Sequence, residues 1–175
     1  SDRGIIEGVK IKLLSRCGIS PDLSGAINSR ALLHIDNAYY LSDISVENYL
    51  CKTNTSSSTA FRGFGGNQGM MIIENIMDNV AKYLKKDPAE VRKINFYQKD
   101  TKNITHYGMK IQDNVINEIF NGLIKSSNYK KRRLGIKKFN SKSKYLKKGL
   151  AITPVKFGIS FTTTHLNQAG ALVHI

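Results

Sequence analysis

The sequence is poor in the residues that build disulfide frameworks and zinc sites. Its 175 residues include no tryptophan, three prolines, two cysteines and four histidines. Cys17 and Cys51 form no CxxC pair, and the dispersed histidines lack the spacing of a zinc site. We also find no signal-peptide pattern and no apolar run long enough to span a bilayer. We therefore expect a protein of a reducing, cytoplasmic compartment that has no membrane partner.

Acidic residues are missing from the last third of the chain. All 13 lie at or before Glu118, whereas the segment 125–148 is densely basic and the net charge is +14. Such a run is typical either of a nucleic-acid footprint or of a solvated surface. It contains few aromatic residues for base stacking and no nucleic-acid-binding motif. We therefore do not expect nucleic acid to be the partner.

The length and apolar content are sufficient for one domain with a core. The chain has 175 residues, of which 41% are apolar. It begins without a methionine and ends in the apolar stretch 170–175, which looks like the start of a strand. We therefore expect residues 1–175 to be an internal fragment of a larger domain.

Apolar periodicity predicts an α+β fold. Strands or extended segments are predicted at 4–14 (ending near Gly18), 35–41, 45–52, 150–161 and 166–175. Helices are predicted at 23–33, 68–84 and 88–95, the last with Asp87 as its N-cap and Pro88 at its first position. A further helix is predicted to be capped by Asp113, and the basic run is predicted to prolong the helical character until Gly149 ends it. The segment 65–148 is thus expected to be mainly helical, and 149–175 to form strands that continue beyond the C-terminus.

A polar, glycine-rich stretch, residues 51–69, leads into the predicted helix 68–84. Its hydroxyl groups are followed by glycines that let backbone N–H groups approach a ligand, with the helix N-terminus directed at the same place. Arg62 adds a forked cation suited to phosphate or carboxylate. This pattern favours the binding of an anion, and a glycine turn that binds nothing is the alternative that the residues leave open.

Four blocks of sequence carry a resemblance to a known family. They are SRALLHIDNAY at 29–39, CKTN with TAFRGFGG at 51–54 and 59–66, PAEVRKIN at 88–95, and KFGISFT with LNQAGAL at 156–162 and 166–172. With these blocks in this order, the chain resembles the molybdenum-cofactor-binding subunit of the xanthine dehydrogenase and aldehyde oxidase family. One departure is Asn67, where the family usually has proline.

The resemblance implies a partial molybdopterin-binding domain and a molybdenum hydroxylase. It implies that the full-length protein oxidises hypoxanthine or xanthine to urate with oxygen taken from water. Electrons then pass to iron–sulfur clusters, FAD and NAD on other domains or subunits, and a dimer of such assemblies is expected. The family's general-base glutamate falls outside this chain, so we expect the fragment alone to be inactive.

The same blocks imply roles for individual residues. Arg30 resembles the catalytic arginine that stabilises negative charge on the substrate, Phe64 and Phe161 the two rings that sandwich the purine, and Thr162 a hydroxyl that binds it. The expected contacts to the pterin come from Arg62, Gly63, Phe64 and Gly65, with Arg62 near the molybdenum but no side chain as its ligand. Without the resemblance, Arg30 could simply interact with the dipole of its helix. Phe161 could be a core residue of a strand, and Thr162 could be a turn residue.

Two other functions stay open at this point. One is an aldehyde oxidase-like hydroxylase, against which the context of Arg30 argues. The other is a non-enzymatic chain, either a basic binding module or a degenerate fragment, for which the lysine density and Asn67 speak.

Overall fold

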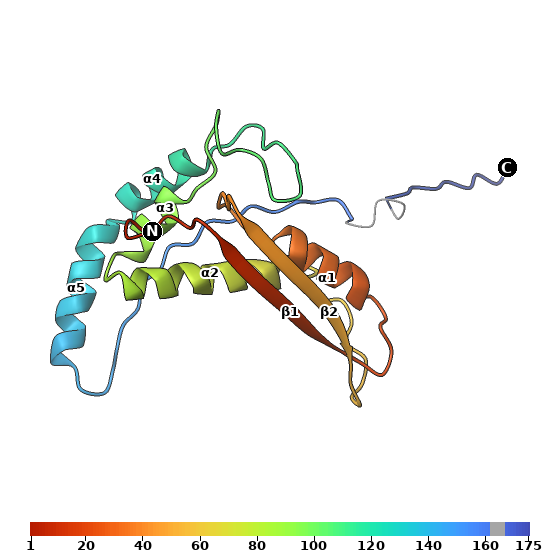
Figure 1. The fold of residues 1–175 in the computed structure, drawn as a ribbon, viewed down its shortest axis with the longest axis horizontal. Coiled ribbons are helices and arrows are strands. Elements are labelled where there is room, and N and C mark those ends of the chain that lie inside the picture. Colours follow the sequence, from red (N-terminus) through yellow and green to blue (C-terminus); the bar gives the residue numbers. More distant parts are fainter. Residues whose placement is uncertain (162–166) are drawn as a thin grey trace.

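The computed structural model describes residues 1–161 and 167–175. Two strands and five helices occur in these residues (Figure 1). In chain order they are β1 (Val9–Gly18), α1 (Ser24–Leu33), β2 (Ile44–Lys52), α2 (Gly66–Tyr83), α3 (Pro88–Ile94), α4 (Ile116–Ser126) and α5 (Tyr129–Lys142). The predicted α+β class is confirmed.

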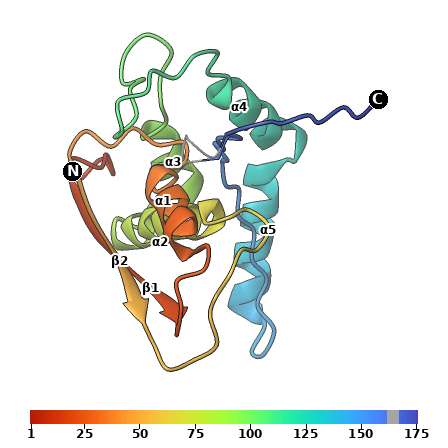
Figure 2. The same ribbon diagram turned by 90° about the vertical axis from the view of Figure 1, so that its right-hand side faces the viewer.

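The two strands form a parallel pair joined by α1. Val9 pairs with Ile44, and the register runs to Arg16 and Cys51 before an irregularity shifts it. Parallel pairing requires such a crossover, and the helix provides it. Alternate side chains of β1, among them Ile11 and Leu13, are buried against α1, while the intervening ones are exposed. The sheet therefore holds α1 in place on one of its faces (Figure 2).

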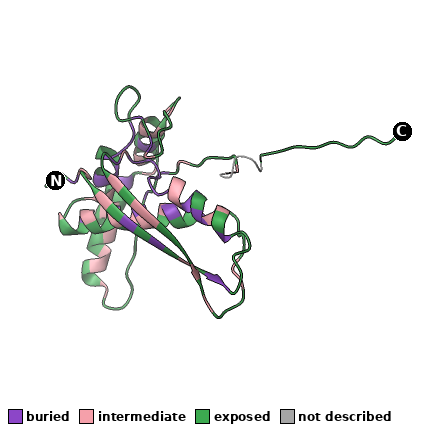
Figure 3. Cartoon of the chain, turned by 45° about the vertical axis from the view of Figure 1, so that its right-hand side comes forward, coloured by how far each residue is buried: buried purple, intermediate pink, exposed green. Residues whose placement is uncertain are grey.

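Helix α2 passes through the centre of the molecule. Its apolar residues recur at spacings of three and four, and Ile73, Met77 and Ala81 are completely buried. These residues pack in one core cluster with Phe96 and Phe120. Figure 3 shows buried and exposed residues interspersed along the helices and strands. The predicted helix is confirmed, and it begins two residues earlier than expected, at Gly66. Among the described residues, no helix combines the length and the apolar character needed to cross a bilayer.

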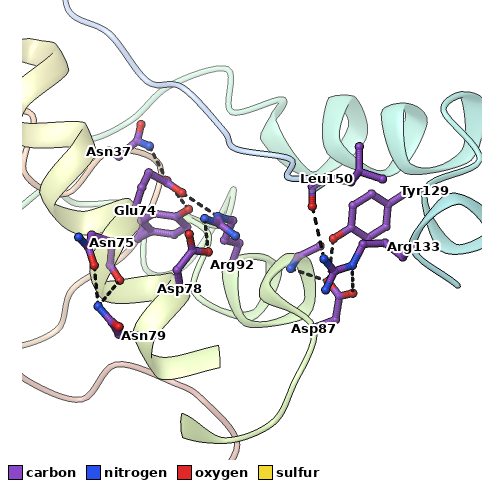
Figure 4. Close-up of polar contacts among 12 residues, drawn as sticks. Asn37, Glu74, Asn75, Asp78, Asn79, Asp87, Arg92, Tyr129, Arg133 and Leu150 are labelled. Carbon is purple, nitrogen blue, oxygen red and sulfur yellow. Dashed lines mark hydrogen bonds and ion pairs between the residues drawn. The ribbon is translucent and has the colours of Figure 1, made fainter. Parts of the chain in front are cut away.

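The predicted N-cap of α3 is confirmed and has a second role. The carboxylate of Asp87 accepts a hydrogen bond from the N–H of Ala89 at 2.8 Å, with Pro88 at the start of the helix. The same carboxylate accepts from the Tyr129 hydroxyl at 2.9 Å and from Arg133 Nε at 3.3 Å (Figure 4). One acidic side chain therefore both begins α3 and fastens α5 to it.

A buried charge network joins α2, α3 and the segment after α1. Arg92, which is 1% exposed, donates to Glu74 at 2.7 Å and to Asp78 at 2.8 Å. Glu74 also accepts from the Tyr39 hydroxyl at 2.5 Å and from the Asn37 side-chain amide at 2.9 Å (Figure 4). The buried cation is thus fully partnered, as a charge removed from water must be.

Three predicted elements differ from the structure in the middle of the chain. Residues 35–41 form turns with a single bridge between Tyr39 and Phe96, so the predicted strand is wrong. Helix α4 begins at Ile116, whose N–H is accepted by the Asn114 side chain, and Asp113 is therefore not its cap. The basic run is helical, as predicted, but it forms a separate helix, α5, that ends at Lys142, because Asn128 adopts a left-handed conformation between α4 and α5.

The predicted C-terminal strands are also wrong for the part of the segment that the structure describes. Residues 149–161 and 167–175 contain no strand, although residues 150–161 run extended past α2 and α1 (Figure 1). Their backbone groups bond to side chains instead of to a neighbouring strand. Residues 167–175 are exposed along their whole length, and Val173 is 80% exposed. Alternating apolar residues without a partner strand form no ladder.

Candidate cofactor and substrate site

Three segments that are distant in sequence meet at the C-terminal end of α1. They are the end of α1 itself, the glycine loop at 61–69, and the extended residues 150–161, which we call the strap. The strap carries Phe157 and Phe161, and the loop carries Phe64. The geometry of the candidate site follows from how these three segments are fastened together.

The glycines of the loop are required by its contacts with protein. Gly63 and Gly65 have φ angles of +94° and +96°, a region that residues with a Cβ rarely adopt. A methyl group on Gly65 would lie 2.0 Å from the carbonyl oxygen of Ile27 in α1, and one on Gly69 would lie 2.3 Å from that of Ala31. A methyl group on Gly66 would lie 2.5 Å from the ring of Phe157. The loop therefore packs closely on both α1 and the strap.

Phe64 is held in a costly backbone conformation between two of these glycines. Its φ of +48° is in the left-handed region, which costs a bulky residue about 1–2 kcal/mol. Asn67 closes the turn, because its side-chain amide donates to the carbonyl of Arg62 at 3.1 Å. The asparagine that replaces the family's usual proline thus stabilises the loop.

Arg30 fastens α1 to the strap. It is 5% exposed, and its terminal nitrogens donate to the carbonyl oxygens of Gly158 at 2.6 Å and Ser160 at 2.5 Å. Its guanidinium carbon lies 5.2 Å from the ring centroid of Phe157 and 5.8 Å from that of Phe64. Within the described residues its Nε has no hydrogen-bond partner. A buried cation with N–H groups still free is suited to an acceptor atom of a ligand.

The structure brings together the two rings predicted to bind the purine. The centroids of Phe64 and Phe161 are 5.3 Å apart, with an angle of 53° between the ring planes. Two aromatic rings in contact keep their centroids about 4.5–7 Å apart. A purine placed between Phe64 and Phe161 makes two such contacts, so the two phenylalanine centroids would have to be at least about 9 Å apart. The two rings therefore touch, and a flat ligand enters only when they separate. Thr162, the predicted hydroxyl, lies outside the described residues.

His34 joins the same two segments as Arg30. Its Nδ1 donates to the Arg30 carbonyl at 2.9 Å, and its Nε2 accepts from the N–H of Gly158 at 3.0 Å. The imidazole is tilted against the Phe157 ring at 4.8 Å. Burial, aided by the positive charges of Arg30 and Lys156, lowers the pKa of His34 from its ordinary value. The ring is therefore neutral near pH 7.

An ion pair between Asp36 and Lys156 also anchors the strap. Asp36, which is fully buried, accepts from the ammonium of Lys156 and from the Tyr97 hydroxyl at 2.6 Å. Burial raises the pKa of Asp36, but the neighbouring His106, Lys156 and Tyr97 together outweigh it and hold this pKa below its usual range. The pair is thus charged at neutral pH.

Asn37 completes the attachment of the strap. Its side chain donates to the carbonyl of Pro154 and accepts from the N–H of Lys156, both at 3.0 Å. Sequence reasoning assigned no role to His34, Asp36, Asn37 or Lys156, although all four lie within the blocks that carry the family resemblance. Their presence in those blocks was the only sign in the sequence that they have a role. The neighbouring residues in the sequence do not show that these side chains hold the strap.

Comparison with known proteins places this arrangement in a family. The model of the molybdopterin cofactor-binding domain matches residues 1–96, more than half of the chain. The chain therefore belongs to the molybdopterin cofactor-binding domain family.

Relatives of known function are xanthine dehydrogenases. The chain is 45% identical over 172 residues to xanthine dehydrogenase/oxidase of Gallus gallus, and 40% identical over 172 residues to xanthine dehydrogenase of Dictyostelium discoideum. Each alignment covers 98% of this chain but only 12% of the relative. The chain thus spans about an eighth of the length of these relatives.

Solved structures of two oxidoreductases share the fold. The aldehyde oxidoreductase of Desulfovibrio desulfuricans covers 78% of this chain with a TM-score of 0.68 and 23% identity, and the match takes in 15% of its own chain. The CO dehydrogenase of Oligotropha carboxidovorans covers 81% with a TM-score of 0.68 and 19% identity, over 18% of its chain. At these identities the likeness shows the fold alone.

The described residues fit a molybdopterin at the glycine loop. Arg62, Asn67 and Gln68 are exposed beside the start of α2, whose first turn has no side-chain cap. An exposed guanidinium and uncapped N–H groups are donors for an anionic, nitrogen-rich cofactor. The described residues offer no cluster of three His, Cys, Asp or Glu side chains to a metal ion. A metal held by the pterin itself makes no demand for such a cluster.

Proposed function

We propose that this chain supplies one side of the substrate pocket and one cofactor-binding loop of a xanthine dehydrogenase. The observation that carries the proposal is the meeting of three separate segments: the Phe64 and Phe161 ring centroids lie 5.3 Å apart, and Arg30 lies 5.8 Å from the Phe64 centroid and donates to the carbonyl of Ser160, the residue before Phe161. The 40–45% identity to named xanthine dehydrogenases supports the choice of reaction. The reaction converts xanthine and water to urate, with release of two electrons and two protons.

In this proposal each residue of the chain has a separate task. Phe64 and Phe161 move apart and hold the flat purine between them, where their faces and edges favour an aromatic partner. Arg30 has five N–H groups and uses two of them on the strap, so the others can stabilise negative charge on an exocyclic oxygen of the purine. Thr162 is proposed to hydrogen-bond the substrate.

The cofactor is proposed to lie against the glycine loop. Arg62 and the backbone of Gly63, Phe64 and Gly65 hold the pterin, with Arg62 near the molybdenum and no side chain of this chain as its ligand. When bound, the cofactor supplies the oxygen transfer and accepts the two electrons. The task of the chain is to place the purine ring next to it and to exclude water from the contact.

The remaining parts of the enzyme are proposed to lie outside this chain. Because the chain spans about an eighth of its relatives, the iron–sulfur clusters, FAD, the NAD site and the general-base glutamate belong to other domains or subunits. We expect a dimer of such assemblies and no turnover by the isolated chain.

The test is the Arg30→Met variant of the intact enzyme. Loss of the stabilising guanidinium is expected to lower kcat/KM for xanthine by about 100-fold or more, as the loss of a single charge-stabilising donor does elsewhere. Turnover of a simple aldehyde, which has no exocyclic oxygen to stabilise, is expected to fall much less. Arg132→Met on the exposed face of α5 is the matched control and is expected to change neither rate.

Two outcomes would contradict the assignment. Equal losses on xanthine and aldehyde would mean that Arg30 acts only by fastening the strap. A wild-type enzyme that oxidises aldehydes but not xanthine would favour the aldehyde oxidase-like alternative. The molybdenum-to-protein ratio must be measured in each variant, because a loss of cofactor would lower both rates together.

A further inference from the structure

His34 closes a ring of hydrogen bonds between α1 and the strap. The side chain of Arg30 donates to the Gly158 carbonyl, the Gly158 N–H donates to His34 Nε2, and His34 Nδ1 donates to the Arg30 carbonyl. Both polar backbone groups of Gly158 are thus bound by Arg30, in the last turn of α1, and by His34, four residues later at its C-cap. His34 is 5% exposed, so its ring nitrogens are shielded from water, whereas Gly158 itself lies in an exposed part of the strap.

The protonation state of His34 follows from its two partners. A carbonyl oxygen can only accept, so Nδ1 carries the proton, and Nε2 must offer a lone pair to the Gly158 N–H. The charged groups nearest the ring are Arg30 and Lys156, which disfavour the imidazolium, and Asp36, which favours it. With burial added, the neutral tautomer that accepts from the strap is the stable form.

The strap has no strand beside it, so its position depends on such side-chain contacts. The N–H groups of Lys156 and Gly158 donate to Asn37 and His34, and Gly158 and Ser160 accept from Arg30. The Gly158 N–H is the last strap amide held by α1 before Phe161. Between Gly158 and Phe161, Arg30 holds the Ser160 carbonyl, and the Asn167 side chain holds the N–H and the carbonyl of Phe161 itself. An acceptor at His34 Nε2 therefore acts together with these contacts on the direction in which the chain leaves Gly158 toward that ring.

We propose that His34 is a positioning residue for substrate binding: by accepting the Gly158 N–H it sets the place of Phe161 relative to Phe64. The inference rests on the proposed function, in which these two rings bind the purine. It predicts that loss of the acceptor weakens the binding of a purine more than it changes the chemistry. The aldehyde reaction, which needs no flat ring between the two phenylalanines, is expected to be spared.

A pair of variants of the intact enzyme separates this hydrogen bond from the other contacts of the ring. His34→Gln places its Oε1 near the former Nε2 and can accept from Gly158, whereas His34→Asn reaches only the Nδ1 position. Neither side chain keeps the ring contact with Phe157. We expect His34→Asn to raise the KM for xanthine and the dissociation constant of urate about tenfold, the effect of one buried hydrogen bond. His34→Gln is expected to stay within about threefold of wild type.

Hydrogen–deuterium exchange of the peptide 154–161 gives a readout that needs no substrate. It is expected to be faster in His34→Asn than in His34→Gln and wild type. Unchanged exchange and unchanged constants in His34→Asn would overturn the proposal, as would equal defects in both variants. A parallel loss of molybdenum and of aldehyde turnover in His34→Asn would show a purely structural role and also overturn it. If wild type fails to bind urate while the exchange difference persists, the proposed function fails and the attachment of the strap by His34 stands.

Discussion

Replacing Gly65 with alanine tests the close packing of the glycine loop on α1. The new methyl group would lie 2.0 Å from the carbonyl oxygen of Ile27 and 3.1 Å from the amide nitrogen of Ala31. Real Cβ atoms essentially never approach other atoms within 3.0 Å, so the loop and α1 must separate by about 1 Å. The φ of +96° adds strain that alanine cannot avoid.

The size of the effect follows from these two terms. A left-handed conformation costs a residue with a Cβ about 1–2 kcal/mol, and forcing a methyl group into a packed contact costs about 1–3 kcal/mol. We therefore expect Gly65→Ala to destabilise this part of the enzyme by about 2–5 kcal/mol, and to lower its thermal midpoint by at least about 5 °C. Because α1 carries Arg30, the KM for xanthine is expected to rise as well.

Gly122→Ala is the matched control for this prediction. Gly122 lies within α4, and a methyl group there meets nothing within 4 Å. Since alanine is the better helix former, this variant is expected to be stabilised by up to about 1 kcal/mol. The measurements are differential scanning fluorimetry and the molybdenum-to-protein ratio of both variants. A Gly65→Ala enzyme with the midpoint and cofactor content of wild type would refute the close contact between the loop and α1.

Two further predictions concern the attachment of the strap. Lys156→Met leaves the fully buried Asp36 carboxylate without its cation, and is expected to lower the free energy of unfolding by about 3–5 kcal/mol, as measured by chemical denaturation. The double variant Lys156→Met with Asp36→Asn is expected to recover part of this loss. A double variant no more stable than Lys156→Met would count against a buried ion pair. The second prediction concerns pH. Burial lowers the pKa of His34 from 6.5, so below about pH 6.5 the unfolded state takes up a proton that the folded state does not. The contribution of neutral His34 to the free energy of unfolding is therefore expected to be complete above pH 6.5. It is expected to be lost as the pH falls from 6.5 through the lower pKa of the folded state. Melting curves between about pH 8 and pH 5 should show a smaller acid loss in His34→Gln, and an equal loss in both proteins would contradict this role of His34.

Elements defined by local signals could be predicted from the sequence. The apolar stripe of α2 and the Asp87–Pro88 start of α3 are each encoded within a few neighbouring residues, and the structure has both. The two long strands were also found, but their parallel pairing was not, because register depends on contacts between residues about 35 positions apart.

The failures have a common physical cause. Residues 35–41 and the strap look like extended segments in the sequence, but their backbone groups bond in turns and to the side chains of Arg30, His34 and Asn37. A periodic pattern reports which side chains face inward and does not report what the backbone bonds to. The strap is alternately buried at Ile152 and Pro154, as a strand would be, without a ladder. The sequence accordingly pointed to Arg30, Phe64 and Phe161, which the structure brings together, and did not indicate how the strap is attached.

The glycines of the loop have two possible physical reasons: close approach of a ligand, and close packing against other parts of the protein. The sequence suggests glycines that admit a ligand, yet the space beside Gly65, Gly66 and Gly69 is filled by α1 and by the ring of Phe157. What remains for an anionic cofactor is the exposed Arg62 and the uncapped N–H groups at the start of α2. Because the same loop packs closely against α1 and the strap, it sets the position of Phe64 relative to Arg30 and Phe161. A change in a loop glycine is therefore expected to disturb the proposed substrate pocket and the binding of the cofactor together, whereas a change in Arg62 should weaken the binding of the cofactor alone.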